Sequence, residues 1–298
     1  MPIICTSIRH AVGILVTPYA RQNFYIFSQA FHPNRNPFIA WCVLYAGYYV
    51  LSRGDSFSQM ALNILHIPVN FGCEIGHLWY IYMLIGLYLV TPIISPWLQQ
   101  ASKRELEGYL GLWIITTFLP YIHLVYPEVL GEAFWNDTPL LYYFTGFIGY
   151  FILGYYLKRF GYPSAALSWI ILIVGFALSA GIFCSRIDTV PTVPELELSW
   201  GFCTVNVFLM TLGLFSLIGR LSLKGKNAAC KLLSDISIKS YGMYLAHILF
   251  LNFYYGLFKS ISDAAYVTIP LIAVCTFITV YIFVYLLSYL PKSKYIIG

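Results

Sequence analysis

Charged residues are scarce in this chain. Only 10% of its 298 residues are Asp, Glu, Lys or Arg, whereas 59% are hydrophobic and the mean hydropathy is +0.74. A soluble domain carries about 25% charged residues. The polar surface is therefore too small to cover a water-soluble globule, and the composition predicts a polytopic membrane protein instead.

Several signatures of chemistry are also absent. The seven cysteines form no CxxC pair, which excludes a metal-ligand set or a disulfide framework built on that spacing. No Walker A, GxGxxG, HExxH or GxSxG pattern occurs. We therefore expect neither a bound metal or cofactor nor a nucleic-acid partner. The first 37 residues also lack the apolar run and small-residue cleavage site of a signal peptide.

The chain contains several long apolar runs. A helix needs roughly 20 apolar residues to cross the hydrocarbon of a bilayer. Pro68 interrupts an amphipathic pattern between residues 53 and 76, so we expect a short interfacial or re-entrant segment there. The fold predicted is an all-α transmembrane bundle of about eight spans. The eight segments are 38–51, which is short, 77–97, 108–126, 140–157, 165–183, 200–219, 240–258 and 266–290.

The basic residues predict how these spans are oriented. When the loops are assigned alternately to two sides, Lys and Arg gather strongly on one of them, and cytoplasmic loops carry that excess. We therefore expect a multi-pass protein of the plasma membrane with a cytoplasmic C-terminus. The rich side holds Lys103, Arg104, Lys158, Arg159, Arg220, Lys224, Lys226, Lys231, Lys239, Lys292 and Lys294, and the poor side holds Arg53, Arg186 and Lys259.

Four stretches together resemble a known family. "NPFIAWCVLYAGYYV" (36–50) is an aromatic-rich helix start, and "GHLWYIYMLIGLYLVTPII" (76–94) opens on His-Leu-Trp-Tyr and closes on Thr-Pro. "YYFTGFIGYFILGYYLKR" (142–159) is rich in Phe and Gly, and "SIKSYGMYLAHILFL" (237–251) carries a histidine early in a late helix. In this order, over about residues 36 to 290, the chain is similar to the membrane-bound acyltransferase family 3.

The resemblance implies an enzyme that transfers an acyl group, acetyl or another short acyl. The donor would be a cytoplasmic acyl-CoA-type co-substrate, and the acceptor a hydroxyl of a cell-surface polysaccharide or of its lipid-linked precursor. Partners would be membrane lipids, the donor and the glycan. The family's catalytic histidine lies in its first span, and this chain shows neither of the family's first two spans. No catalytic residue is therefore assigned from the resemblance.

Residues 1–37 form an atypical N-terminal segment ahead of the acyltransferase-like domain, 38–298. Read one nucleotide later, codons that fit Cys5 to Pro18 and Tyr25 to Pro37 can encode residues close to the family's second span and its basic pre-helix segment. We hypothesise that this segment is an out-of-frame translation. The catalytic histidine would then lie upstream of Met1, and the chain would be a truncated, inactive version. The alternative is a genuine N-terminus.

Polar residues at the start of the 77–97 span are candidates for substrate binding. Glu74 and His77 could line an acceptor pocket and bond a sugar hydroxyl, with Trp79 and Tyr80 stacking beside them. The alternative is that the aromatic residues are interfacial anchors. Basic pairs on the opposite side, Lys103–Arg104 and Lys158–Arg159, suit the phosphates of a donor. Topology alone also explains those pairs.

His247 is the deeper candidate. Ionisable groups inside spans usually face the bundle interior or a polar cavity. Tyr244 and His247 share a helix face because they are three residues apart, so we expect both near the substrate. The alternative is a core histidine bonded to Tyr241 or Tyr244. His123, near the end of its span, is expected to extend outward.

A non-catalytic polysaccharide exporter is the rival function. A transporter often needs paired intramembrane charges or inverted repeats. No Asp, Glu, Lys or Arg lies well inside any of the eight predicted spans. That pattern argues against ion-coupled transport but not against a passive path for sugar.

Overall fold

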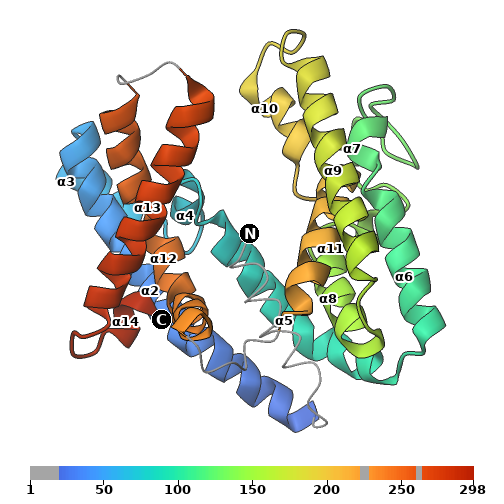
Figure 1. Cartoon of the computed structure of the whole chain (residues 1–298), viewed down its shortest axis with the longest axis horizontal. Coiled ribbons are helices and arrows are strands. Elements are labelled where there is room, and N and C mark those ends of the chain that lie inside the picture. The colour runs from blue at the N-terminus through green and yellow to red at the C-terminus, as the bar shows by residue number, and fades with distance from the viewer. Residues whose placement is uncertain (1–19, 222–227, 260–263) are drawn as a thin grey trace. The chain divides into compact units, whose positions relative to one another are not determined.

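The computed structural model describes residues 20–221, 228–259 and 264–298, and these ranges form helices and turns without a β-strand (Figure 1). The all-α prediction is confirmed. Contacts divide the described chain into two units. The first consists of residues 20–92 with 228–298, apart from its gaps, and the second of residues 93–221.

The first unit gathers helices from both ends of the chain. Its closest helix pair is α12 with α13, and α14 packs on α2. The indole of Trp41 donates from Nε1 to the carbonyl of Ile296 at 2.9 Å, and the Tyr45 hydroxyl donates to that of Leu245 at 2.9 Å. These bonds fasten α2 to the C-terminal helices. The elements are α2 (Ala20–Arg53), α3 (Phe57–Leu65), α4 (Phe71–Glu74), most of α5 (Trp79–Gln100), α12 (Ala228–Phe258), α13 (Ala265–Leu287) and α14 (Lys294–Ile297).

The second unit is built on the close pair of α9 and α11, with α6 and α8 packed together. Its core centres on Trp113, which is fully buried and donates from Nε1 to the carbonyl of Gly146 at 3.0 Å. The rings of Tyr150 and Phe208 lie against the indole, with centroids 4.8 and 5.3 Å away. The elements are α6 (Lys103–Thr116), α7 (Leu119–Ile122), η1 (Tyr142–Phe144), α8 (Ile148–Phe160), α9 (Ala165–Arg186), α10 (Val193–Leu196), η2 (Glu197–Trp200) and α11 (Val205–Gly219).

Three described helices, α5, α9 and α13, are long and apolar enough to cross a membrane. The segment Val193–Trp200 followed by α11, bent by 42° at its break, makes a fourth if the pair counts as one span. The expected number of about eight spans is not confirmed. Helices α6 and α8 have only 14 and 13 residues, whereas a straight span needs about 17 to 25.

Two of the expected spans are interrupted for local reasons. In 108–126, α6 ends at Thr116 and α7 is a separate turn that begins with Pro120 at its second position. The hydroxyls of Thr116 and Thr117 donate to the carbonyls of Trp113 and Ile114, both at 2.6 Å, and so compete with the helix ladder. In 140–157, a 3₁₀ turn precedes α8, which begins only at Ile148. Gly146 has a positive φ of 83° there, which breaks the helix.

The N-terminal helix is longer than the pattern of residues suggests. The sequence shows little helical periodicity before residue 38, yet α2 begins at Ala20 and runs through Pro33 and Pro37. The out-of-frame hypothesis stays untested, and residues 1–19 lie outside the described residues. Between α2 and α5, α3 ends at Leu65, ahead of Pro68, and has nine residues. It is too short to cross a bilayer, which agrees with the interruption expected there.

Candidate functional site

A cluster of histidine and tyrosine side chains lies in the first unit, where the turn before α5 meets α12 and α2. His77 stands in that turn, directly after Gly76, whose φ of 96° favours glycine. Its ring lies 4.6 Å from that of His247, 5.3 Å from that of Tyr244 and 5.8 Å from that of Tyr45, all edge to face. Residues 170 positions apart in the sequence are thus brought together.

Tyr244 connects the two histidines. Its hydroxyl donates to the backbone carbonyl of His77, and its own backbone carbonyl accepts from Nδ1 of His247 at 2.6 Å. The second bond is the local contact expected if His247 were a satisfied core residue. The contact between His77 and His247 goes beyond that expectation, because it ties His247 to the start of α5.

Both ring nitrogens of His77 are buried, and neither has a hydrogen-bond partner among the residues that the structure describes. Carbonyls of Ile75, Tyr244 and Leu245 lie near the imidazole, but none has hydrogen-bond geometry to it. Leaving a buried polar group unpaired costs about 1–3 kcal/mol. Such an atom in a native fold needs a reason, of which a ligand or an ordered water is one. The cluster can therefore hydrogen-bond a polar ligand through His77.

The other candidates for substrate binding near the start of α5 are Tyr80, Trp79 and Glu74, and only the two aromatic residues lie at the cluster. Tyr80 is buried, and its ring lies 5.7 Å from that of Tyr244, so it belongs to the cluster. Trp79 is half-buried and packs edge to face on Tyr80 at 6.2 Å. Glu74 is exposed, at the end of the short helix α4. No described contact joins Glu74 to His77, so the structure does not bring that pair together.

The basic pairs have mainly local partners. Lys103 is exposed and lies 3.7 Å from the carboxylate of Glu107. Arg159 donates from Nη1 to the carbonyls of Leu98 and Ala101, both at 3.0 Å, and its guanidinium lies 5.1 Å from the Phe160 ring centroid. A cation there satisfies carbonyls at the C-terminal end of α5. Arg104 and Lys158 are exposed, and no partner is described for either.

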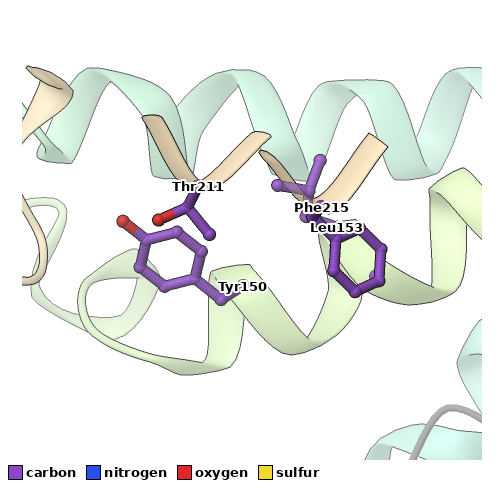
Figure 2. Close-up of a pocket in the computed structure, with 5 residues that line it drawn as sticks. Tyr150, Leu153, Thr211 and Phe215 are labelled. Atoms are coloured by element: carbon purple, nitrogen blue, oxygen red, sulfur yellow. The ribbon is translucent and has the colours of Figure 1, made fainter. Parts of the chain in front are cut away.

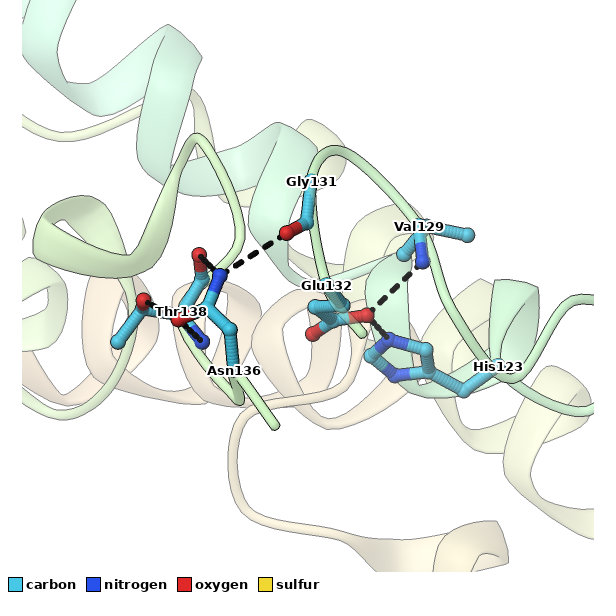
Figure 3. Close-up of polar contacts among 6 residues, drawn as sticks. All are labelled: His123, Val129, Gly131, Glu132, Asn136 and Thr138. Atoms are coloured by element: carbon cyan, nitrogen blue, oxygen red, sulfur yellow. Dashed lines mark hydrogen bonds and ion pairs between the residues drawn. The ribbon is translucent and has the colours of Figure 1, made fainter. Parts of the chain in front are cut away.

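Sequence reasoning missed a second polar group, in the loop after α7. Nε2 of His123 lies 2.6 Å from Oε2 of Glu132, and the same oxygen accepts the Val129 amide at 3.0 Å, as Figure 3 shows. An open hollow of about 310 Å³ adjoins them, lined also by Glu128, Phe134 and Asp137. The expectation that His123 extends outward overlooked Glu132, because nothing in the sequence pairs two residues nine apart in a loop.

The Val129 amide, followed by His123, lowers the pKa of Glu132 below its ordinary value. The bonds of the ionised carboxylate therefore stabilise the loop at neutral pH, and that contribution is lost as pH falls through the lowered pKa. We expect the Val129 amide proton resonance to titrate in NMR with a midpoint below about 4.3, the ordinary value for Glu. The variant Glu132→Gln should abolish this titration. A midpoint at or above the ordinary value would contradict the bonding described.

A small cavity of about 10 Å³ lies between α8 and α11. Figure 2 shows Tyr150 and Leu153 of α8 facing Thr211 and Phe215 of α11 across it. A cavity needs roughly 10–15 Å³ to hold one water molecule. This gap is therefore a packing feature and no ligand site. Among the described residues, no group of three or more His, Cys, Asp or Glu side chains could hold a metal ion.

Comparison with known proteins identifies the chain at the level of family. No curated protein and no solved structure matches it significantly. A family model described as an acyltransferase domain matches residues 36–289, which is most of the sequence. The apolar helices agree with an integral membrane protein of this kind. The chain belongs to the membrane-bound acyltransferase family 3.

Proposed function

We propose that this chain transfers a short acyl group, such as acetyl, from an acyl-CoA-type donor to a hydroxyl of a cell-surface polysaccharide or its precursor. The family supports acyl transfer in general. The donor would be a cytoplasmic co-substrate, not a bound cofactor. The protein would lie in the plasma membrane among its lipids, with the C-terminus in the cytoplasm, as the distribution of Lys and Arg favours.

The unpaired nitrogens of His77 carry the proposal about the acceptor. An imidazole can donate to and accept from a hydroxyl, and both of its nitrogens are withheld from water in the cluster. A sugar hydroxyl that reaches His77 would supply the missing partner. Tyr80 and Trp79, beside it, would offer aromatic surface to the sugar ring.

Membranes that contain the full chain, incubated with radiolabelled acetyl-CoA and an acceptor polysaccharide, test the proposal. Label that appears on the glycan supports acyl transfer. Glycan that crosses the membrane without label would instead support the exporter, and glycan that neither moves nor gains label would contradict both functions.

The variant His77→Phe should separate stability from function. A phenyl ring keeps the edge-to-face contacts but removes two unpaired polar atoms, so the melting temperature should rise in protein without acceptor. Acceptor binding should weaken, because a hydrogen bond is worth about 1 kcal/mol net. We expect the KM for the acceptor to rise about tenfold, which corresponds to 1.4 kcal/mol. Thermal unfolding and acceptor-dependent initial rates measure the two effects.

His66 supplies the matched control. It is an exposed histidine at the end of α3, in the same unit and outside the cluster. The variant His66→Phe should leave the melting temperature and the KM unchanged. A His77→Phe variant with a wild-type KM would contradict the role proposed for His77.

A further inference from the structure

A tight turn in the loop after α7 carries two large aromatic side chains. Ala133 and Asn136 exchange both of their backbone hydrogen bonds, at 3.0 and 2.8 Å, so that Phe134 and Trp135 occupy the two corner positions. Phe134 is 91% exposed and Trp135 is 74% exposed. Their rings lie edge to face, with centroids 6.5 Å apart. Corner positions usually hold Gly, Pro, Asn, Asp or Ser, so the turn itself does not explain this aromatic pair.

The backbone around the aromatic pair is held by its own hydrogen bonds. The side chain of Asn136 donates from Nδ2 to the carbonyl of Gly131 at 2.9 Å, and its Oδ1 accepts the amide of Thr138 at 3.3 Å (Figure 3). None of these bonds involves either aromatic side chain. The rings are therefore presented on a fixed support, and substitution of either ring leaves that support in place.

The open hollow of about 310 Å³ lies against this turn, because Phe134 is one of its lining residues. Ligand pockets in proteins typically have volumes of about 300–1,000 Å³. The carboxylates of Glu128 and Asp137, which also line the hollow, are exposed and make no hydrogen bond or ion pair with another described residue. No Lys or Arg is among the described residues that line it. The hollow is therefore negatively charged at neutral pH and offers free hydrogen-bond acceptors.

This combination of groups fits a sugar. An ionised carboxylate only accepts hydrogen bonds, and the hydroxyls of a sugar are donors. The C–H groups of a sugar ring pack on the face of an aromatic ring, which is apolar and carries partial negative charge. A sugar with a carboxylate of its own would be repelled by Glu128 and Asp137. The same repulsion disfavours the phosphates of lipid headgroups as occupants.

The hollow lies at the end of the second unit that is opposite to the basic pairs. Arg159, at the end of α8, binds the carbonyl of Ala101 just before α6 at 3.0 Å, whereas Trp113, near the end of α6, binds that of Gly146 just before α8 at 3.0 Å. The two helices are therefore antiparallel, and the loop that joins their other ends carries the hollow. With the basic end in the cytoplasm, this loop faces the side on which a surface glycan is found.

We propose that the hollow and the aromatic turn beside it form a subsite for one sugar ring of the acceptor glycan, and that its carboxylates select neutral and amino sugars over acidic ones. The inference rests on the function proposed above, since it takes a glycan as the acceptor. The subsite binds and selects the glycan, and it takes no part in the acyl transfer.

Selectivity can be measured without any turnover. Isothermal titration calorimetry of the full chain in lipid nanodiscs, at about pH 6 where the carboxylates are ionised, gives the Kd of three tetrasaccharides. The probes are tetraglucosamine, which is cationic, its neutral N-acetylated form, and tetragalacturonate, which is acidic. We expect the affinity to fall in that order. Binding that is tightest for tetragalacturonate, or no binding of any of the three, would overturn the proposal.

The variant Trp135→Ala tests the aromatic surface. It should weaken binding of the neutral tetrasaccharide about tenfold, the effect of a typical aromatic anchor. Trp169→Ala is the matched control, because it removes another exposed tryptophan of the same unit, on α9 and outside the loop. That control should leave the Kd unchanged. If the two variants bind the neutral probe equally well, the turn does not contact the sugar and the proposal fails.

A double variant, Glu128→Gln with Asp137→Asn, tests the charge. An amide oxygen still accepts hydrogen bonds, so the Kd of the neutral probe should change by less than about threefold. The affinity for tetragalacturonate should rise about fivefold, and that for tetraglucosamine should fall by a similar factor. Asp188→Asn, an exposed acid just after α9, is the control and should leave all three affinities unchanged. Unaltered selectivity in the double variant would contradict the role of the carboxylates.

Insertion of the aromatic turn into the lipid surface is the competing outcome. Nanodiscs made with bromine-labelled acyl chains quench tryptophans that lie among those chains. The fluorescence that is lost in Trp135→Phe should escape this quenching and should respond to the neutral tetrasaccharide instead. Strong quenching of that component, with no response to sugar, would identify a membrane anchor and overturn the subsite.

The outcomes separate this proposal from the function on which it rests. Sugar binding with the expected selectivity, in a chain that labels no glycan, would support the subsite and overturn only the acyl transfer. Normal labelling with an unchanged acceptor affinity in Trp135→Ala would overturn only the subsite. If a variant does not fold, which its elution profile in detergent shows, the selectivity of the wild-type chain still decides.

Discussion

Alanine in place of Gly149 is expected to destabilise the second unit more than alanine at any other glycine described there, because its added Cβ would make the shortest contact. A Cβ built there would lie 2.0–2.1 Å from three atoms of the Trp113 indole, a separation that no packed side chain tolerates. The indole would have to leave its fully buried position. It would lose its bond to the Gly146 carbonyl and its contacts with Tyr150 and Phe208.

The expected loss approaches that of removing the tryptophan. Substitution of a buried Trp by Ala costs about 3–5 kcal/mol, a large part of the roughly 5–15 kcal/mol that stabilises a typical protein. We therefore expect Gly149→Ala to lower the melting temperature markedly and to reduce the yield of folded protein. Thermal unfolding in detergent, followed by intrinsic fluorescence, measures the change.

Two further variants make this test specific. Gly111 lies on α6, the helix that carries Trp113, and a Cβ there meets nothing within 4 Å. Gly111→Ala should be neutral or stabilising, because glycine inside a helix costs about 0.5–1 kcal/mol relative to alanine. With Trp113→Ala already present, Gly149→Ala should add little, because the clash is gone. Additive losses in that double variant would contradict the described contact.

The sequence predicted several of the residues that belong to the candidate site, but it did not predict which of them contact each other. The His-Leu-Trp-Tyr stretch and the three-residue spacing of Tyr244 and His247 singled out residues that do cluster. Spacing along one helix says nothing about which other helix it meets, so the contact between His77 and His247 needed the structure. Spacing also fails for Glu74, which is only three residues before His77 but is exposed and has no described contact with it.

The fold class was predictable from composition, whereas the continuity of the helices was not. Hydropathy over 108–126 and 140–157 is high, but Pro120 and the positive φ of Gly146 decide where the helices stop. Arg159 shows that a residue predicted as a topology signal can also have a structural role. Its position after an apolar run marks it as a topology signal, yet its guanidinium binds two carbonyls at the end of α5. A hydropathy profile does not show which backbone carbonyls at a helix end require a hydrogen-bond donor.

Separation of α9 from α11 is the second large effect to expect. A Cβ on Gly213 would lie 2.7 Å from the backbone nitrogen of Leu172 and the carbonyl oxygen of Ser168. A Cβ on Gly175 would lie 2.7 Å from the nitrogen of Met210 and 2.8 Å from the oxygen of Asn206. Backbone atoms cannot rotate away, so the helices themselves would have to move apart.

Movement of these helices would break a buried polar network. Asn206 is fully buried and donates to the Ser179 hydroxyl at 2.7 Å and to the Ser199 carbonyl at 2.8 Å. Its Oδ1 accepts the Tyr121 hydroxyl at 2.6 Å. Apolar helices in lipid associate through close packing and such bonds, because lipid supplies no hydrophobic drive between them. A loss of packing at the glycines therefore also removes the bonds.

Gly175→Ala and Gly213→Ala should each lower stability by about 1–3 kcal/mol, the usual cost of overpacking. The double variant should lose less than the sum, because the first methyl group already opens the interface that the second would disturb. Gly181→Ala is the matched control on α9, since a Cβ there meets nothing within 4 Å. Thermal unfolding in nanodiscs measures all four variants. If Gly175→Ala matches Gly181→Ala, the backbones of α9 and α11 do not approach each other closely at Gly175, which would contradict the described packing.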